Sequence, residues 1–356
     1  MTPGSGGGAD SAEDALLTVI GAGQAGLAAA HASSRRGVRA LVLEAAGHPG
    51  GSWPHYYDSL TLFSPARFSG LPGRPMPGDP DRYPRRDEVV SYLRDYAARL
   101  DADLRCGHRV ERVVRDGDGF LLTLADGSRI RSRAVVSATG GFARPHRPEP
   151  PGLADFTGAV LHAAEYRSPE PFAGLRVVVV GGGNSGVQIA AELAGTARVT
   201  LATRSPVAWA EQRPLGRDIH WWFVRSGLDA APLGRLWARA PVLVNDDGRY
   251  RAAVAAGAPD RREMFTRLEG DEVTWADGSV ERVDAVLLAT GYRPALDHLA
   301  PTGALDREGR PLHRGGVSTA VPGLGYVGLE FQRTFASATL RGVGRDARHV
   351  VRRLLP

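Results

Sequence analysis

The sequence has one cysteine, no long apolar stretch and no secretory signal pattern, and each of these shortages excludes a class of protein. Cys106 is the only cysteine, so the chain has no CxxC dithiol and no internal disulfide, which excludes enzymes that pass electrons through paired thiols. We expect this thiol to be buried and structural, at the start of a strand-like segment. No apolar stretch reaches the ~20 residues that a membrane span needs. The first residues, MTPGSGGGADSAED, read as a flexible acidic tail without the apolar core of a secretory signal, so we expect a cytoplasmic protein.

Lysine is also absent, since all 44 basic residues are arginines, a bias typical of GC-rich codon usage. The net charge of +5 suits an anionic cofactor, but the arginines are dispersed among 39 acidic residues. We therefore expect no nucleic-acid partner and no membrane partner. The pattern also offers no cluster with metal-ligand spacing, no acid–base dyad and no nucleophilic triad. A length of 356 residues suggests two domains.

Two glycine-rich turns stand at matching places in the two halves of the chain. The first lies in LLTVIGAGQAGLAAA and the second in LRVVVVGGGNSGVQIAAEL, and each follows an apolar run and opens a helical segment. Glycine lets the backbone approach a pyrophosphate at a helix N-terminus, where the dipole favours an anion. Two such motifs in register predict two bound dinucleotides. The residues that we expect to line them are Gly21, Gly23, Gln24, Ala25 and Gly26 in the first motif and Gly181, Gly183, Asn184, Ser185 and Gly186 in the second.

The residue that ends the second strand of each unit separates the two ligands. Glu44 ends RALVLE, where a carboxylate accepts hydrogen bonds from an adenosine ribose and repels a 2′-phosphate. Arg204 follows VTLAT at the equivalent place, where a guanidinium can pair bidentately with a 2′-phosphate. The first site therefore suits FAD or NAD, and the second suits NADP. The alternatives are a solvated strand-end carboxylate and one more of many surface arginines.

A second repeated pattern closes each unit, because a buried strand runs into an Ala-Thr-Gly turn in both halves. We expect a helix near Asp87–Leu100 and a β-meander with turns at 116–119 and 126–127 before the first of these turns. The division that we predict is a flexible tail at 1–13, an FAD-binding domain at 14–148 and 297–356, and an NADPH-binding domain at 149–296. The turn residues that we expect to face the cofactors are Ala138, Thr139, Gly140, Thr290 and Gly291.

Between the two glycine motifs lies FTGAVLHAAEYR, which matches the pattern FxGxxxHxxx(Y/F). With the paired glycine and ATG motifs, it makes nearly the whole chain resemble the flavin-containing monooxygenases. The passages GGSWPHYYDSLTLFSPARFSGLPG and GRDIHWWFVRSGLD look most like the compact bacterial members, including the organoarsenical-monooxygenase-like group. The resemblance implies an α/β fold of two Rossmann-like, glutathione-reductase-like domains, the first of them discontinuous.

The resemblance also implies roles for particular residues. Gly51, Ser52 and Trp53 would lie along the flavin, the first motif with Glu44 would hold FAD, and the second with Arg204 would hold NADPH. His162, in the linking motif, would couple nicotinamide binding to the domain arrangement and so act in catalysis; the alternative is a surface histidine. The run His220-Trp221-Trp222 could form the wall of a substrate pocket or belong to the core.

Two positions depart from the family pattern. Where mammalian-type members place an asparagine that is thought to steady the oxygenated flavin, this chain has Phe63 followed by Ser64. Where many reductases have an aspartate that contacts the ribityl chain, this chain has Leu329 followed by Glu330. The C-terminal contacts to the flavin are therefore left open.

The leading hypothesis is an NADPH-dependent FAD monooxygenase. It would insert one oxygen atom from O2 into a small molecule, at a soft N, S or As atom, through a C4a-(hydro)peroxyflavin. A flavin-dependent NAD(P)H oxidase or dehydrogenase without oxygen insertion is the alternative that Phe63 favours. A redox-sensing or purely binding flavoprotein is a third hypothesis, in which two intact cofactor sites would be superfluous. The expected partners are the substrate and O2, and a homodimer is left open.

Overall fold

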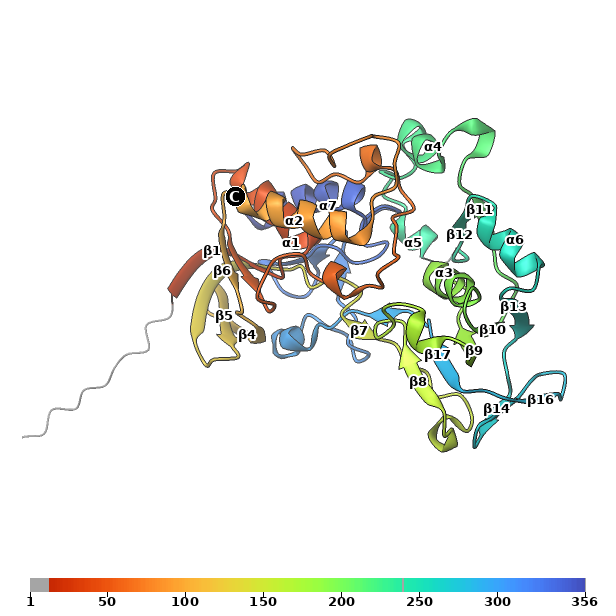
Figure 1. The fold of residues 1–356 in the computed structure, drawn as a ribbon. Helices are drawn as coiled ribbons and strands as arrows, with labels where there is room; N and C mark the ends of the chain where they lie inside the picture. The colour runs from red at the N-terminus through yellow and green to blue at the C-terminus, as the bar shows by residue number, and fades with distance from the viewer. Residues whose placement is uncertain (1–12, 239, 356) are drawn as a thin grey trace, which may run out of the picture.

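The computed structural model of the protein describes residues 13–238 and 240–355, and its main feature is a pair of parallel sheets that lie side by side (Figure 1). In the first sheet, apolar and β-branched strands are buried on both faces, as a sheet between two layers requires. Its parallel strands, in spatial order, are β21 (Leu324–Tyr326), β6 (Arg129–Ser137), β1 (Glu13–Ile20), β2 (Leu41–Glu44) and β3 (Asp103–Cys106).

Three helices cover one face of this sheet: α1 (Gln24–Ser34), α2 (Arg86–Ala98) and α7 (Leu340–Leu354). The other face carries the meander of β4 (Val110–Asp116), β5 (Gly119–Leu124) and β6, together with the 3-10 helix η6 (Asp297–Thr302). The short strands β19 (His313–Arg314) and β20 (Val317–Ser318) extend the sheet beyond β21. Strand β21 pairs with β6 and α7 packs on α1, so the C-terminal segment lies on the first sheet.

The second sheet repeats the plan with its own glycine motif at the centre. Its parallel strands, in spatial order, are β13 (Asp260–Glu263), β10 (Arg198–Thr203), β9 (Arg176–Val180), β17 (Ala285–Leu288) and β8 (Ala159–His162). Covering elements are α3 (Asn184–Leu193) and α6 (Arg249–Ala255) on one side and the meander β14 (Arg267–Glu269), β15 (Glu272–Thr274) and β16 (Val280–Arg282) on the other. The predicted α/β fold with two Rossmann-like units is confirmed.

Two connections join the units. The strands β7 (Arg144–Pro145) and β18 (Tyr292–Arg293) pair where the chain leaves the first unit and where it returns. An insertion in the second unit reaches back over the first, as Figure 1 shows near α4 and α5. Its elements are β11 (Trp209–Glu211), α4 (Ile219–Ser226), α5 (Gly234–Trp237) and β12 (Val244–Asp246).

Several local predictions can be checked directly. The helix predicted near residues 87–100 is α2, and both expected turns of the meander are present. Cys106 ends β3 rather than starting a strand, and its side chain is half-buried, so the prediction of a buried thiol was wrong. The predicted tail lies outside the described residues except for Glu13, which already belongs to β1. No described helix is both long and apolar enough to cross a membrane.

Candidate functional site

The first glycine motif forms a turn that only glycine can make. Gly21 has φ +102°, and a Cβ at this position would lie 2.9 Å from the carbonyl oxygen of Ala138. A Cβ on Gly26 would lie 1.7 Å from the oxygen of Gly21, because the start of α1 packs directly on the turn. The motif and the first ATG turn, which sequence analysis placed at the same cofactor, are therefore in contact.

The middle glycine of this motif faces a second predicted segment. Gly51 has φ +59°, and a Cβ on it would lie 2.9 Å from the Cα of Gly23. Neither glycine has a side chain that could cover the N-terminus of α1, no side chain caps this N-terminus, and no acidic residue occupies its first turn. Free N–H groups and the helix dipole together make such an N-terminus a site for a pyrophosphate.

Glu44 occupies the strand end that sequence analysis assigned to the ribose. Its side chain is buried, and its carboxylate accepts hydrogen bonds from the backbone N–H of Ala22 at 2.7 Å and of Ala46 at 2.9 Å. These bonds fix the carboxylate beside the glycine turn and rule out the alternative of a solvated strand-end residue. A carboxylate has about four acceptor positions, so it can still accept from a ribose hydroxyl.

The glycine turn, the N-terminus of α1 and Glu44 together form what we call the first cradle. Side chains from distant segments meet beside it. The Gln24 amide accepts a hydrogen bond from the Trp53 indole and donates one to the oxygen of Ala338 at 2.9 Å. Ser52 Oγ lies 3.0 Å from the hydroxyl of Tyr56, and burial raises the pKa of Tyr56 to about 12. Near neutral pH, the wall that Gln24, Ser52, Trp53 and Tyr56 form is therefore polar, and these four side chains carry no charge.

The cradle fits a flavin dinucleotide on two further observations. The hydroxyl of Thr139, in the predicted ATG turn, is buried and has no hydrogen-bond partner in the described chain, so it is available to a ligand. Gly328, with φ +92°, closes on the start of α1, where its Cβ would lie 2.5 Å from that of Ala25. Gly140 also has a positive φ, of +73°. The residues present can hold FAD with its pyrophosphate at α1 and its ribose at Glu44.

The second motif repeats this backbone geometry. Gly181 has φ +132°, and its Cβ would lie 2.3 Å from the oxygen of Ala289; a Cβ on Gly186 would lie 2.1 Å from the oxygen of Gly181. Around Gly183, the nearest atom to an added Cβ is a methyl of Val242 at 3.8 Å. The second cradle therefore has the same backbone turn as the first, but the space around its middle glycine is more open.

The side chains around the second cradle are arranged differently. The amide of Asn184 bonds to the backbone of Leu243 and Asn245, so its side chain serves the loop and only its backbone is free for a ligand. Ser185 is exposed, and Thr290 donates to the oxygen of His146 at 2.5 Å. Arg204 is exposed, and its guanidinium has no hydrogen-bond or ion-pair partner in residues 13–238 and 240–355. It is thus free to bind a 2′-phosphate.

His162 ends β8 and is fully buried, so the alternative of a surface histidine was wrong. Its Nδ1 accepts from the N–H of Ala164 at 3.0 Å, and its Nε2 lies 3.1 Å from the oxygen of Gly291. Its ring meets that of Tyr292 edge-on at 5.0 Å. Burial lowers the pKa of His162, so the neutral ring holds the second ATG turn by donating to Gly291.

Hydrogen bonds from two side chains, Tyr57 and Arg167, tie the flavin-side loop to the second unit. The hydroxyl of Tyr57 donates to the amide oxygen of Gln188, on α3, at 2.6 Å. Arg167, which follows the linking motif, donates to the backbone oxygens of His55 and Tyr56. The segment after the predicted flavin residues therefore bridges the two cradles.

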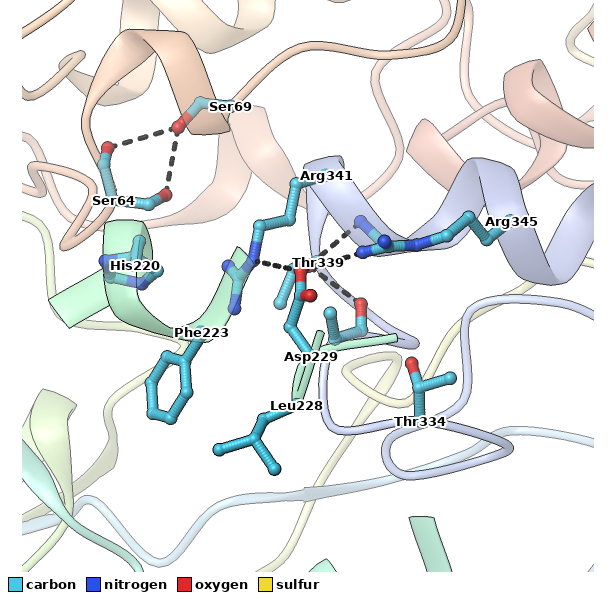
Figure 2. Close-up of polar contacts among 12 residues, drawn as sticks. Ser64, Ser69, His220, Phe223, Leu228, Asp229, Thr334, Thr339, Arg341 and Arg345 are labelled. Atoms are coloured by element: carbon cyan, nitrogen blue, oxygen red, sulfur yellow. Dashed lines mark hydrogen bonds and ion pairs between the residues drawn. The ribbon is translucent and has the colours of Figure 1, made fainter. Parts of the chain in front are cut away.

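A buried ion cluster forms a second bridge between the units. Figure 2 shows Asp229, from the insertion, between Arg341 and Arg345 of α7. Its Oδ2 accepts from Arg345 at 2.7 Å and lies 3.4 Å from Arg341 Nε. One carboxylate thus faces two guanidinium groups, and burial lowers the pKa of Arg341. The cluster joins the insertion to the helix that completes the first unit.

The aromatic run on α4 divides between interior and surface. His220 is buried, bonds to Asp218 at 2.8 Å and stacks on Phe63 with the ring centroids 5.9 Å apart. Burial lowers the pKa of His220, so the ring is neutral. Trp222 is 37% exposed and meets Trp221 edge-on. The interpretation of this run as core is therefore wrong for Trp222, whereas Trp221 is half-buried, and His220 with Phe63 forms one of the contacts to the first unit.

Comparisons with known proteins agree with this geometry. Residues 18–222 match a family model described as pyridine nucleotide-disulphide oxidoreductase. The solved structure of a flavin-containing monooxygenase from Stenotrophomonas maltophilia is similar, with a TM-score of 0.85 and 36% identity over 96% of this chain and 98% of that one. The chain belongs to the flavin monooxygenase family. This monooxygenase is thus a FAD-dependent oxidoreductase whose cofactors are FAD and NADPH.

Curated relatives extend the comparison. An oxidoreductase named CzcO-like, from Geobacillus kaustophilus, is 32% identical to this monooxygenase over 347 residues, which cover 95% of this chain and 98% of that protein. The indole-3-pyruvate monooxygenase YUCCA1 of Oryza sativa subsp. japonica is 33% identical over 308 residues, covering 77% and 76%. The first relative therefore matches the monooxygenase over nearly its full length.

Sequence analysis missed the residues that connect the cradles. Tyr57, Gln188 and Asp229 lie within passages quoted above, but nothing in those passages marks them as contacts between the units, and Gly328 was one of 45 glycines. The only signal for Gly328 was its place beside Leu329, where the family's aspartate is missing. Leu329 is buried, so it packs instead of facing a ligand.

Proposed function

We propose that this monooxygenase transfers one oxygen atom from O2 to an electron-rich N, S or As atom of a small molecule, with NADPH as the electron donor. The observation that carries the proposal is the uncharged wall beside the FAD cradle, formed by Gln24, Trp53 and Tyr56. A neutral, protonated oxygen donor transfers oxygen to a soft nucleophile, whereas a deprotonated donor attacks a carbonyl carbon. Bound FAD supplies the redox chemistry, by accepting a hydride and passing its electrons to O2.

Several of the predicted residues have a defined part in this proposal. The N-terminus of α1 binds the FAD pyrophosphate, Glu44 binds the ribose and the buried Thr139 hydroxyl meets the flavin. Arg204 binds the 2′-phosphate of NADPH. His162 is a positioning residue, because both its ring nitrogens are used within the protein and it acts through the Gly291 turn.

An oxidase that forms only hydrogen peroxide is the second candidate, and Phe63 favours it. The Phe63 side chain is 39% exposed and stacks on His220, so it supplies no amide to the flavin side. The two candidates differ in where the electrons of NADPH go. They share both cofactor sites, so the cradles do not distinguish them.

An isotope experiment separates the candidates. The holoenzyme is supplied with NADPH, ¹⁸O2 and a panel of a thioether, a tertiary amine, a trivalent organoarsenical and indole-3-pyruvate, the acid in the rice relative's name. We expect one ¹⁸O atom in a heteroatom product and a matching fall in peroxide. Peroxide yields equal to NADPH consumed with every compound would contradict oxygen transfer to these classes of substrate and favour the oxidase. Labelled oxygen found only after reaction of indole-3-pyruvate would contradict the heteroatom assignment.

A further inference from the structure

The C-terminal halves of α1 and α7 enclose a basic groove that neither cofactor site uses. Ala28, His31, Ala32 and Arg35 follow one another at helical spacing on a single face of α1. Gly344, Arg348 and Arg352 do the same on α7, which packs against α1. The groove has a volume of about 340 Å³, and Arg36 and Pro72 complete its lining.

Small residues create the space and arginines surround it. Ala28, Ala32 and Gly344 are buried and form the floor, and at Gly344 a Cβ would lie 2.2 Å from Pro72. Among the described residues that line the groove, none carries a carboxylate. In the part of the chain that the structure describes, Arg35, Arg348 and Arg352 are exposed and form no ion pair. This distinguishes them from many arginines elsewhere on the surface, which pair with acidic neighbours.

The pKa of His31 indicates that the electrostatic potential inside the groove is positive. Burial lowers its pKa, and the positive charges of Arg35 and Arg348 lower it further. Guanidinium groups on two opposing walls match the oxygens of phosphate groups bidentately. A concave site of this size suits a small ligand better than it suits the flat surface of a macromolecule.

The groove is separate from the FAD site. The FAD pyrophosphate would meet the N-terminus of α1, and Arg35 caps its C-terminus. A helix of 11 residues spans roughly 16 Å, so one dinucleotide pyrophosphate cannot reach both ends.

We propose that this groove binds a small molecule that carries two or more adjacent phosphate groups. Its phosphates lie between the guanidinium groups of α1 and those of α7, above the alanine and glycine floor. The class includes free pyrophosphate, tripolyphosphate and the phosphate tail of a nucleotide. The site lies outside the monooxygenase reaction and holds whether or not the proposed substrate class is right.

The test measures binding of inorganic tripolyphosphate to the FAD-loaded enzyme by calorimetry, at low ionic strength and with saturating NADP⁺ so that the second cradle is occupied. The variants are Arg348→Gln/Arg352→Gln on α7 and Arg35→Gln on α1. The matched control is Arg112→Gln/Arg115→Gln on β4, which removes two exposed charges from a different element. Melting curves show that each variant is folded.

We expect one tripolyphosphate per chain, with Kd raised about tenfold or more in the α7 variant, several-fold in Arg35→Gln and less than about twofold in the control. ATP binding tighter than tripolyphosphate would identify a nucleotide as the source of the phosphates, and equal affinity would identify free polyphosphate. Three outcomes overturn the proposal: no binding, equal weakening in the control, and binding only to vesicles of anionic phospholipid. The last would make the face a membrane-contact surface.

Discussion

Gly21 and Gly181 occupy the same place in two parallel sheets, and each lies against the carbonyl of an ATG turn. Around that shared base, the two cradles differ. The first is enclosed, because Gly51 touches Gly23 and Gly328 closes on Ala25 from the far end of the chain. In the second, the one described atom near an added Cβ on Gly183 is a side-chain methyl of Val242.

The charged residue of each cradle shows the same contrast. Glu44 is buried and already holds two backbone N–H groups, so it is part of the folded structure before any ligand arrives. Arg204 is exposed and unpartnered among the described residues, so its interactions are left to the ligand. We infer that the first cradle retains its dinucleotide through many turnovers, whereas the second exchanges its own at every turnover.

The largest expected effect comes from the same substitution made in each cradle. Gly23→Val places a side chain against Gly51 and into the space of the pyrophosphate, so we expect colourless protein with FAD occupancy below about a tenth. Gly183→Val should stay yellow and lose affinity for NADPH. The visible flavin absorbance and the rate of reduction by NADPH measure both. A yellow Gly23→Val protein would mean that FAD does not bind the first cradle.

The next largest effect is expected on the preference for NADPH over NADH. Arg204→Ala should weaken NADPH by about 10–150-fold, the value of a charge-assisted pair of about 1.5–3 kcal/mol, and leave NADH nearly unchanged. Arg198→Ala, at the exposed start of the same strand β10, is the control. KM for both coenzymes is the measurement. Equal losses for NADPH and NADH would show that Arg204 is structural, and a wild type that prefers NADH would contradict the assignment.

We expect low pH to destabilise the first unit through protonation of His298. Burial lowers the pKa of His298 to about 4, and its Nε2 lies 3.5 Å from Ser137 Oγ, beside the first ATG turn. Because the folded pKa lies below the unfolded value of about 6.5, the unfolded chain binds the proton first, and stability falls from pH 6.5 towards 4 by up to ~3 kcal/mol. Release of FAD on heating, followed by fluorescence, should depend less on pH in His298→Gln. Parallel curves for the two proteins would remove His298 as the cause.

The smallest effect is expected at the turn of the second cradle. His162→Ala loses the bond to Gly291, so we expect FAD to be kept, reduction by NADPH to slow several-fold and more peroxide to form. His162→Gln can still donate to Gly291 and should recover part of the rate. Reduction rate and peroxide yield are measured together. Wild-type values of both in His162→Ala would show that the bond has no part in the reaction.

The cradles could be predicted from sequence because their determinants are local. A glycine turn, the helix after it and the strand-end Glu44 or Arg204 lie within about 30 residues, and the geometry of a βαβ unit fixes their relation. Cys106 was misplaced because its residue type favours burial, whereas its position at the end of β3, an edge of the parallel strands, leaves it half-buried.

The links between the cradles could not be predicted in this way. Tyr57 and Gln188 are 131 residues apart, and Asp229 and Arg345 are 116 apart, so their contact depends on how two separately folded units pack. His162 shows the same limit. Its motif placed it between the units, but its burial depends on β17 beside it and on the ring of Tyr292.

The position of α7 in the chain has a consequence for the order of assembly during synthesis. The ribosome makes the strands of the first glycine motif early, but β21 and α7, which complete their sheet and helical layer, come after the whole second unit. Gln24 receives its carbonyl partner from Ala338 only then. We therefore expect that the second unit can fold while the first is still open, and that the first cradle closes as one of the last events in making the protein.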